Sequence, residues 1–162
     1  MSLPGGAREP VDPDAGRALR APVPLVRGRL DVLAVIAAGG GLGALARWGL
    51  ALAVPHRTGA FPVSTLVTNL VGSLLLGALM VVVTDVRPGS RYLRPFAGVG
   101  VLGGFTTFST ATGDVHAMAD AGRLPLAALY LLLSVVGGLL AVAVGLAAAR
   151  RLVRRRPAGA RS

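Results

Sequence analysis

Four long apolar runs constrain this 162-residue chain more than any other feature of its sequence. A helix of about 20 apolar residues spans the ~30 Å hydrocarbon layer of a bilayer, and each run is at least that long. Between Val32 and Ala149 the acids are only Asp85, Asp114 and Asp120, so little charge could cover a water-facing surface. The sequence therefore predicts an all-α membrane protein with four transmembrane helices. We expect them at residues 31–54, 61–84, 93–118 and 124–149.

The two ends of the chain differ from this apolar middle. Residues 1–29 are rich in Pro, Gly and Arg without apolar periodicity, which predicts a disordered cytosolic tail. The first apolar run starts too late and is too long for a cleaved signal peptide. Residues 30–149 form the predicted membrane domain, and residues 150–162 a basic cytosolic tail. The sequence has no cysteine, which excludes disulfides, thiol nucleophiles and cysteine-held metal clusters.

Arginine is distributed unequally between the two sides of the predicted membrane domain. With four spans, both tails and the middle loop share one side, whereas the other side has only Arg57 and Arg123. The positive-inside rule therefore predicts that both termini are cytoplasmic. The C-terminal "RRLVRRRPAGAR" could suggest nucleic acid, but beside a span it favours a topology signal or a contact with anionic lipid. The basic residues on the cytoplasmic side are Arg20, Arg27, Arg29, Arg87, Arg91, Arg94, Arg150, Arg151, Arg154, Arg155, Arg156 and Arg161.

Polar residues form stripes in two of the spans. In the second, Thr65, Asn69 and Ser73 follow at four-residue spacing and share one helix face. The carboxamide of Asn69 needs partners where water is absent, and either an interhelical hydrogen bond or a functional role would supply them. In the fourth, Tyr130 and Ser134 are also four apart. Two such stripes suggest a narrow wet path.

Charged and titratable side chains within or near the spans are few. Arg47 lies inside the first span, where a cation is costly unless it is paired or reaches the interface. Two interpretations of Arg47 stay open: it has a functional role, or its side chain only extends to the outer membrane interface. His56 and His116 lie near span ends, and we expect both to be solvated.

The third span carries the densest group of glycines and hydroxyls, in "GVGVLGGFTTFSTATGD" at residues 98–114. Four glycines weaken the helix just before Phe105, so we expect a break at mid-membrane. Broken spans expose carbonyls that can hold a cation and helix N-termini that favour an anion. A phenylalanine ring edge also attracts an anion weakly. No span carries a deep acid, which argues against a proton-coupled exporter and favours a small anion.

Three motifs occur in an order that resembles a known family. They are "GGGLGALARW" in the first span, "FPVSTLVTNLVGSLLLG" in the second and "GGFTTFST" in the third. Over residues 32–149 the chain is similar to the small dual-topology fluoride channels called Fluc or CrcB. The resemblance implies an ion channel rather than an enzyme. It also implies an antiparallel dimer in the cell membrane, with two pores that let cytoplasmic fluoride leave the cell and one structural sodium at the centre.

The resemblance also assigns roles to particular residues. Asn69 would donate to fluoride, and Phe108 would be the first phenylalanine of the family's "FSTF" box. The carbonyls of Gly103 and Thr106 would hold the sodium ion, and Arg47 would sit near a vestibule. The remaining members of the polar track would be Thr65, Tyr130 and Ser134.

The chain departs from the family pattern at two pore positions and in its charge distribution. The box reads "FSTA", with Ala111 in place of the second phenylalanine, and Gly138 stands where a third hydroxyl of the fourth span is expected. The arginine bias predicts insertion in one orientation only, so an antiparallel dimer would need a second, different chain as partner. Two alternatives stay open, a non-conducting structural subunit and a coupled transporter of a small solute.

Overall fold

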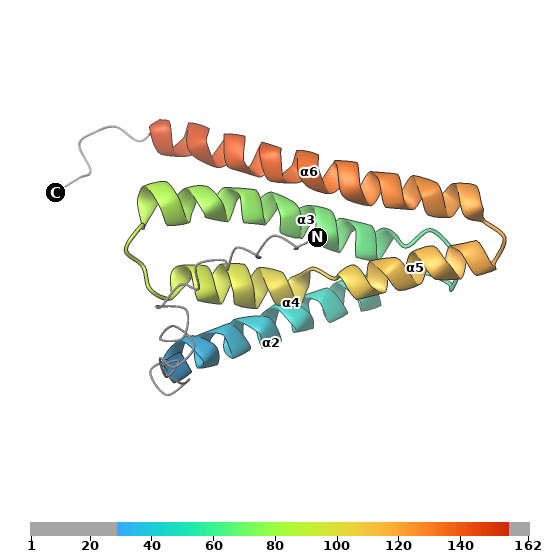
Figure 1. Ribbon diagram of the computed structural model, residues 1–162, viewed down its shortest axis with the longest axis horizontal. Coiled ribbons are helices and arrows are strands. Elements are labelled where there is room, and N and C mark those ends of the chain that lie inside the picture. Colours follow the sequence, from blue (N-terminus) through green and yellow to red (C-terminus); the bar gives the residue numbers. More distant parts are fainter. Residues whose placement is uncertain (1–28, 156–162) are drawn as a thin grey trace, which may run out of the picture. The chain divides into compact units, whose positions relative to one another are not determined.

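The computed structural model describes residues 29–155, and throughout this range the regular structure is helical. Figure 1 shows the helices side by side along most of their length. The expected all-α fold is thereby confirmed, whereas the expected tail at 1–29 lies almost wholly outside the described residues. The elements in chain order are α2 (Leu30–Ala53), α3 (Val63–Val81), η2 (Val82–Val86), η3 (Arg94–Leu102), α4 (Gly103–Phe105), α5 (Phe108–Asp120) and α6 (Leu124–Arg154).

Three helical segments are long and apolar enough to cross a membrane: Leu30–Ala53, Val63–Val86 and Leu124–Arg154. They match the first, second and fourth predicted spans. The third predicted span corresponds to η3, α4 and α5, which are three separate shorter helices. The last span continues to Arg154, into the expected basic tail. Arg151 and Arg154 lie in its final turn, where their positive charges interact favourably with the negative end of the helix dipole.

Close contact between α3 and α6 depends on glycine. A Cβ built on Gly77 would collide with the carbonyl oxygen of Val142, and one built on Gly145 with the carbonyl oxygen of Leu74. Real Cβ atoms do not approach backbone atoms so closely, so only glycine permits this spacing. Small residues that let backbones approach are typical of helix pairs in lipid.

A second close approach joins α2 to η3. A Cβ on Gly100 would lie 2.8 Å from the carbonyl oxygen of Ile36, and one on Gly39 would lie 2.5 Å from that of Phe96. Both glycines therefore serve helix packing. In η3 the turns are also wider than in an α-helix, since the amide of Gly103 reaches the carbonyl of Gly98, five residues earlier. Such turns are rare overall and are frequent at functional sites.

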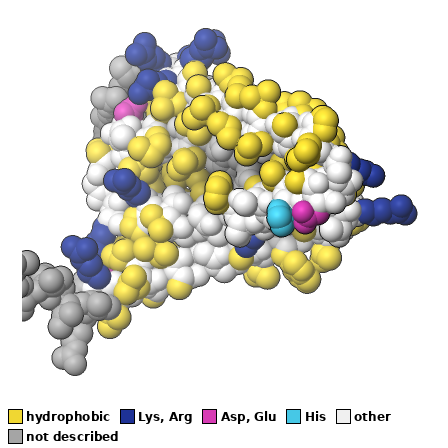
Figure 2. All heavy atoms as spheres, turned by 45° about the vertical axis from the view of Figure 1, so that its right-hand side comes forward, with side chains coloured by type: hydrophobic (Ala, Val, Ile, Leu, Met, Phe, Trp, Pro, Cys, Tyr) yellow, Lys and Arg dark blue, Asp and Glu magenta, His cyan; other side chains and the backbone are white. Residues whose placement is uncertain are grey.

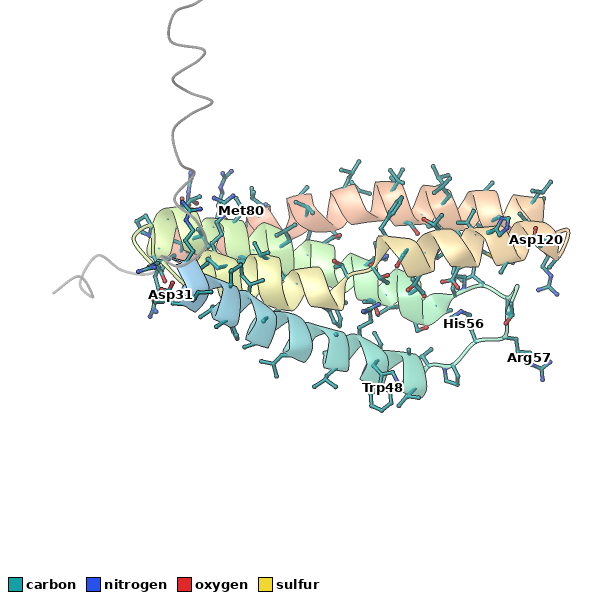
Figure 3. All side chains as sticks on the ribbon, turned by 60° about the horizontal axis from the view of Figure 1, so that its bottom comes forward. Asp31, Trp48, His56, Arg57, Met80 and Asp120 are labelled. Carbon is teal, nitrogen blue, oxygen red and sulfur yellow. The ribbon has the colours of Figure 1, made fainter. Side chains whose placement is uncertain are left out.

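Polar contacts tie the helices together at each end of the bundle. At one end Tyr92 donates to Asp31 over 2.6 Å and Arg91 pairs with the same carboxylate at 2.7 Å. The hydrogen bond to Asp31 raises the pKa of Tyr92. At the other end Arg123 donates to the carbonyl of Gly59, a glycine with φ of 77°. Figure 3 places Asp31 at one end and His56, Arg57 and Asp120 at the other.

The surface of the helical part is largely apolar. Figure 2 shows hydrophobic side chains covering much of one face, with arginines gathered toward its margins. Trp48 is 62% exposed, and Leu139 is 69% exposed. Long helices that expose apolar side chains in this way suit a lipid environment.

Candidate functional site

The helix interruption predicted near Phe105 lies at Thr106 and Thr107. Helix α4 ends at Phe105 and α5 begins at Phe108, and the two threonines between them have extended backbones. The Thr107 hydroxyl oxygen accepts from the amide of Thr110 at 3.1 Å and so caps the N-terminus of α5. Whether this interruption lies at mid-membrane stays a prediction.

Asn69 on α3 is bound to the interruption by two hydrogen bonds. Its Nδ2 donates to the carbonyl of Thr107 at 2.9 Å, and its Oδ1 accepts from the amide of Thr107 at 2.9 Å. The side chain thus satisfies both backbone groups of an extended residue, which buried peptide groups require. This is the interhelical hydrogen bond that the sequence left open for Asn69. Since a carboxamide carries two N–H groups, the second can serve another acceptor.

The hydrogen bond from the Thr107 amide to Asn69 leaves the carbonyl of Gly103 without its helical donor. In a continuous α-helix the amide of Thr107 would donate to the carbonyl of Gly103, but it donates to Asn69 instead. The carbonyl of Thr106 also leaves the helical direction, because its residue has ψ of 158°. Neutral carbonyl oxygens are suitable ligands for a hard cation. The two carbonyls assigned to sodium therefore have the right chemistry for it.

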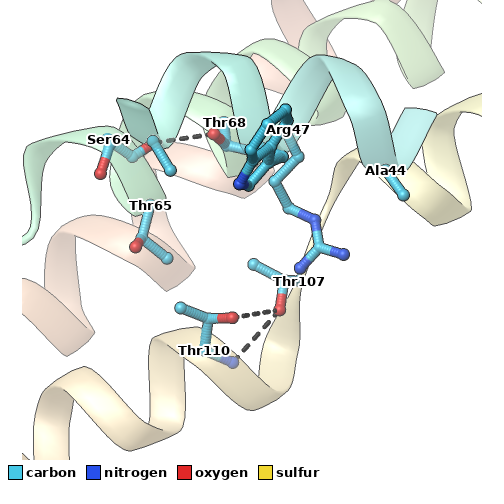
Figure 4. A pocket seen from close by; sticks show the side chains of 9 residues that line it. Ala44, Arg47, Ser64, Thr65, Thr68, Thr107 and Thr110 are labelled. Carbon is cyan, nitrogen blue, oxygen red and sulfur yellow. Dashed lines mark hydrogen bonds between the residues drawn. The ribbon is translucent and has the colours of Figure 1, made fainter. Parts of the chain in front are cut away.

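Arg47 points inward, to the interruption. Its Nε donates to the carbonyl of Gly104 at 3.2 Å, and Figure 4 shows the guanidinium reaching from α2 toward Thr107. A cation at the C-terminal end of a helical segment stabilises the unsatisfied carbonyls there. Arg47 therefore makes an interior contact with the interruption, and its functional role stays a prediction.

Two pockets meet at Thr107, which lines both. The first has a volume of about 240 Å³ and the second about 360 Å³. The first is lined by Ala44, Arg47, Trp48, Ala51, Ser64, Thr65, Thr68, Thr107 and Thr110. The second is lined by Asn69, Gly72, Ser73, Leu76, Gly98, Leu102, Gly103, Thr106, Thr107 and Phe108. Six of the eight predicted site residues are thus divided between these two pockets.

The phenylalanine box has one exposed and one inward position. Phe108, the first helical residue after the interruption, is 86% exposed and lines the second pocket. Ala111 instead packs against the buried group formed by Met118, Ala127 and Tyr130. The position where the family's second ring is missing therefore faces the core of this chain.

Tyr130 and Ser134 lie apart from both pockets. Tyr130 is fully buried, and the edge of its ring meets Phe61 with centroids 5.6 Å apart. Within residues 29–155, the Tyr130 hydroxyl and Ser134 Oγ are buried without a hydrogen-bond partner. Buried hydroxyls without a protein partner often bind water or an ion. The structure does not place these two residues with Asn69 and Phe108.

Both histidines lie at the surface, as expected, but the side chain of His56 is the more covered of the two. His116 is 80% exposed, but His56 is only 26% exposed. His56 Nε2 lies 3.4 Å from Oδ1 of Asp114, and its Nδ1 lies 3.3 Å from Oγ of Ser64. The cause is tertiary, because the loop after α2 folds back over the start of α3 and against α5.

The sequence did not single out Thr107 or Ser64, and it did not predict the contact between His56 and Asp114. A threonine before a new helix is a recognisable N-cap signal, and it would have found Thr107. For the histidine contacts there was no such signal, since His56 and Asp114 are 58 residues apart.

Comparison with known proteins gives one family and close relatives. Residues 34–146 match the family described as "CrcB-like protein, Camphor Resistance (CrcB)". A relative from Streptomyces coelicolor, named fluoride-specific ion channel FluC 1, is 43% identical over 94% of this chain and 94% of its own length. Two from Streptomyces avermitilis, FluC 2 and FluC 3, are 47% and 44% identical over 73% and 79% of this chain, and 77% and 63% of their own lengths.

Proposed function

Because this chain belongs to the CrcB family, we propose that it is a subunit of a fluoride channel through which cytoplasmic fluoride leaves the cell passively. The observation that carries this proposal is the contact of Asn69 with Thr107, where two pockets lined in part by hydroxyl side chains meet within an apolar bundle. The relatives are named as ion channels and not as enzymes. Passive export would lower the toxicity of fluoride in the cytoplasm.

The chemistry of the two pockets supports an anion path. They offer hydroxyls, a carboxamide and one guanidinium, and no carboxylate lines either of them. Neutral donors and weakly positive ring edges bind an anion loosely, which favours rapid passage. Thr65 and Arg47 would serve the first pocket, with Arg47 at its vestibule, and Asn69 and Phe108 the second. The buried hydroxyls of Tyr130 and Ser134 would continue the track.

We propose that η3, α4 and α5 together form the third of four membrane spans, broken at Thr106 and Thr107. The extent from Arg94 to Asp120 is long enough to cross a bilayer even with two extended residues. Both termini would then be cytoplasmic, in the inner or plasma membrane. The arginine clusters of the loop after η2 and of the end of α6 would lie against the anionic lipid of that side.

The functional unit would be an antiparallel dimer with a different, homologous chain. Twelve arginines on one side against two on the other oppose insertion in both orientations, so a second copy of this chain would not supply the inverted partner. Relatives named FluC 2 and FluC 3 occur together in one organism, as such pairs require. Phe108, 86% exposed on this subunit, would be covered by the partner.

A sodium ion at the centre of that dimer would be held by the carbonyls of Gly103 and Thr106. The donor set supports this assignment, because Asn69 has taken the amide that would otherwise bind Gly103. The ion would stabilise the interrupted helix and join the subunits.

A second candidate is a non-conducting subunit needed for assembly. It is favoured by Ala111, which packs into the core of this chain and contributes no ring, and by Gly138 at the place of the third hydroxyl. In that case the complete pore would belong mainly to the partner.

The test is fluoride efflux from liposomes, measured with a fluoride electrode, for the chain alone and for the chain co-expressed with a homologous partner. We expect fast efflux only with the partner. Fast efflux from the chain alone would contradict the proposed heterodimer but would support the proposed fluoride channel. Gradient-dependent uphill movement would contradict the passive channel.

A further inference from the structure

His56 connects three parts of the fold at the end of the bundle opposite Asp31. It belongs to the loop between α2 and α3, and its two ring nitrogens face Asp114 on α5 and Ser64 on α3. The Asp114 side chain is 16% exposed, and its Oδ2 is buried without a hydrogen-bond partner within residues 29–155. Neither histidine of the sequence has a role in the fluoride path described above.

The Ser64 hydroxyl links His56 to the first pocket. Ser64 is 4% exposed and lines this pocket together with Arg47 and Thr107. Its backbone carbonyl accepts from the Thr68 hydroxyl at 2.7 Å, so Thr68 does not compete for the Ser64 side chain. The imidazole of His56 therefore lies directly behind one hydroxyl of the pocket wall.

Protonation of the imidazole would reverse this hydrogen bond. In the neutral ring with a proton on Nε2, that nitrogen donates to Asp114 and Nδ1 accepts from the Ser64 O–H. In the imidazolium both nitrogens donate, so Ser64 Oγ must accept and its own hydrogen turns elsewhere. Ser64 lines the first pocket, and the freed hydrogen would turn toward it. Protonation would thus present one more donor to an anion there.

We infer that His56 is a positioning residue whose protonation turns the Ser64 hydroxyl into the first pocket and speeds fluoride passage at acid pH. This inference rests on the proposed fluoride channel. A second effect acts in the same direction, because the imidazolium neutralises the Asp114 carboxylate that would otherwise repel an anion. Histidine is the side chain that changes charge between about pH 5 and pH 8.

The charged and titratable neighbours of His56 come from every adjacent element. Asp114 on α5 pairs with it directly, and Arg47 on α2 lines the pocket behind Ser64. Tyr130 on α6 meets Phe61 of the same loop, and Arg123 bonds Gly59 of that loop. Arg57 follows in sequence. Asp114 is the single acid among these groups.

The experiment is fluoride efflux from liposomes that hold the channel assembled with its partner, with the same buffer on both sides. Efflux is compared at about pH 5.5 and about pH 7.5, on either side of the ordinary histidine range. Protein-free liposomes at each pH give the leak of hydrogen fluoride through lipid. We expect the wild type to be about fivefold faster at the lower pH, the factor that one ordinary hydrogen bond corresponds to.

Three variants locate the effect. His56→Gln keeps a donor and an acceptor but cannot titrate, so its efflux should not depend on pH. Ser64→Ala lets His56 titrate but has no hydroxyl to turn, so it should lose most of the acid response even if His56→Gln does not fold. His116→Gln is the matched control, an exposed histidine near the same end paired with Asp120, and should respond as the wild type does.

An acid response that survives in both His56→Gln and Ser64→Ala would overturn the inference and leave the channel intact. An absence of fluoride efflux from the wild type at both pH values would instead reject the proposed function on which the inference rests. Equal elution volume and helicity at both pH values are the criteria for a folded variant.

Discussion

Asn69 and Thr107, 38 residues apart in the sequence, exchange two hydrogen bonds of 2.9 Å, from carboxamide to peptide and from peptide to carboxamide. The pairing compensates the helix hydrogen bonds that the extended Thr107 cannot make. It also fixes the position of the interruption relative to α3. Asn69, the pore asparagine of the proposed channel, therefore also stabilises the structure of the site.

Replacement of Asn69 should affect both stability and transport. Asn69→Ala leaves the amide and carbonyl of Thr107 without their partner, at a cost of about 2 kcal/mol. We expect a lower thermal denaturation midpoint, read from the loss of the monodisperse size-exclusion peak after heating, and a loss of fluoride efflux. Ser73→Ala, one turn further along the same face, is the matched control. Equal stability of the two variants would contradict the structural role of the carboxamide.

Arg47 should matter through its charge and its contact with Gly104. Arg47→Gln removes the cation beside the first pocket while keeping a polar side chain, and we expect efflux to fall about tenfold or more, because a charged hydrogen bond is worth at least about 1.5 kcal/mol. Arg57→Gln, in the exposed loop at the same end, should leave efflux within about twofold. Similar losses in both variants would indicate a general effect of outer charge and contradict the specific role of Arg47.

Gly39 should resist substitution because α2 approaches η3 so closely there. Gly39→Ala places a methyl group 2.5 Å from the carbonyl of Phe96, and overpacking of this kind costs about 2 kcal/mol. We expect the variant to aggregate at a lower temperature than the wild type. Gly49→Ala on the same helix meets nothing within 4 Å in this chain and should be neutral or slightly stabilising. A neutral result at Gly39 would argue against the close packing.

Orientation can be measured without background, since the chain has no cysteine. Thr58→Cys lies in the loop after α2 and Ser90→Cys in the loop after η2. In intact spheroplasts a membrane-impermeant maleimide should label only Thr58→Cys, and Ser90→Cys should need permeabilisation. Labelling of Ser90→Cys from outside in about half of the molecules would show dual insertion and remove the reason for a heterodimer.

The elements that follow from local pattern could be predicted from the sequence. Apolar runs indicate the helices, and the spacing of glycines along one helix face indicates where two helices touch, as at Gly39 and Gly100. The polar stripe of Thr65, Asn69 and Ser73 on α3 likewise indicates a wall of the site, since these residues line the two pockets. The type of partner for Asn69 could be anticipated, because a buried carboxamide must be paired.

Relationships that depend on tertiary arrangement could not be predicted. Nothing in the pattern of α6 distinguishes a tyrosine that lines a pocket from one buried against Phe61, so Tyr130 fitted either alternative. The contacts of His56 were not predicted, because they come from residues on two other elements. The sequence also could not show that position 111 faces the core of its own chain.

The most direct test of the central claim is the reversal potential of current through the reconstituted assembly in a planar bilayer under a fluoride gradient. A passive fluoride channel predicts reversal close to the fluoride equilibrium potential, unchanged when a chloride or proton gradient is imposed. Reversal that follows chloride or protons, or an absence of current from an assembly that is folded and inserted, would contradict it.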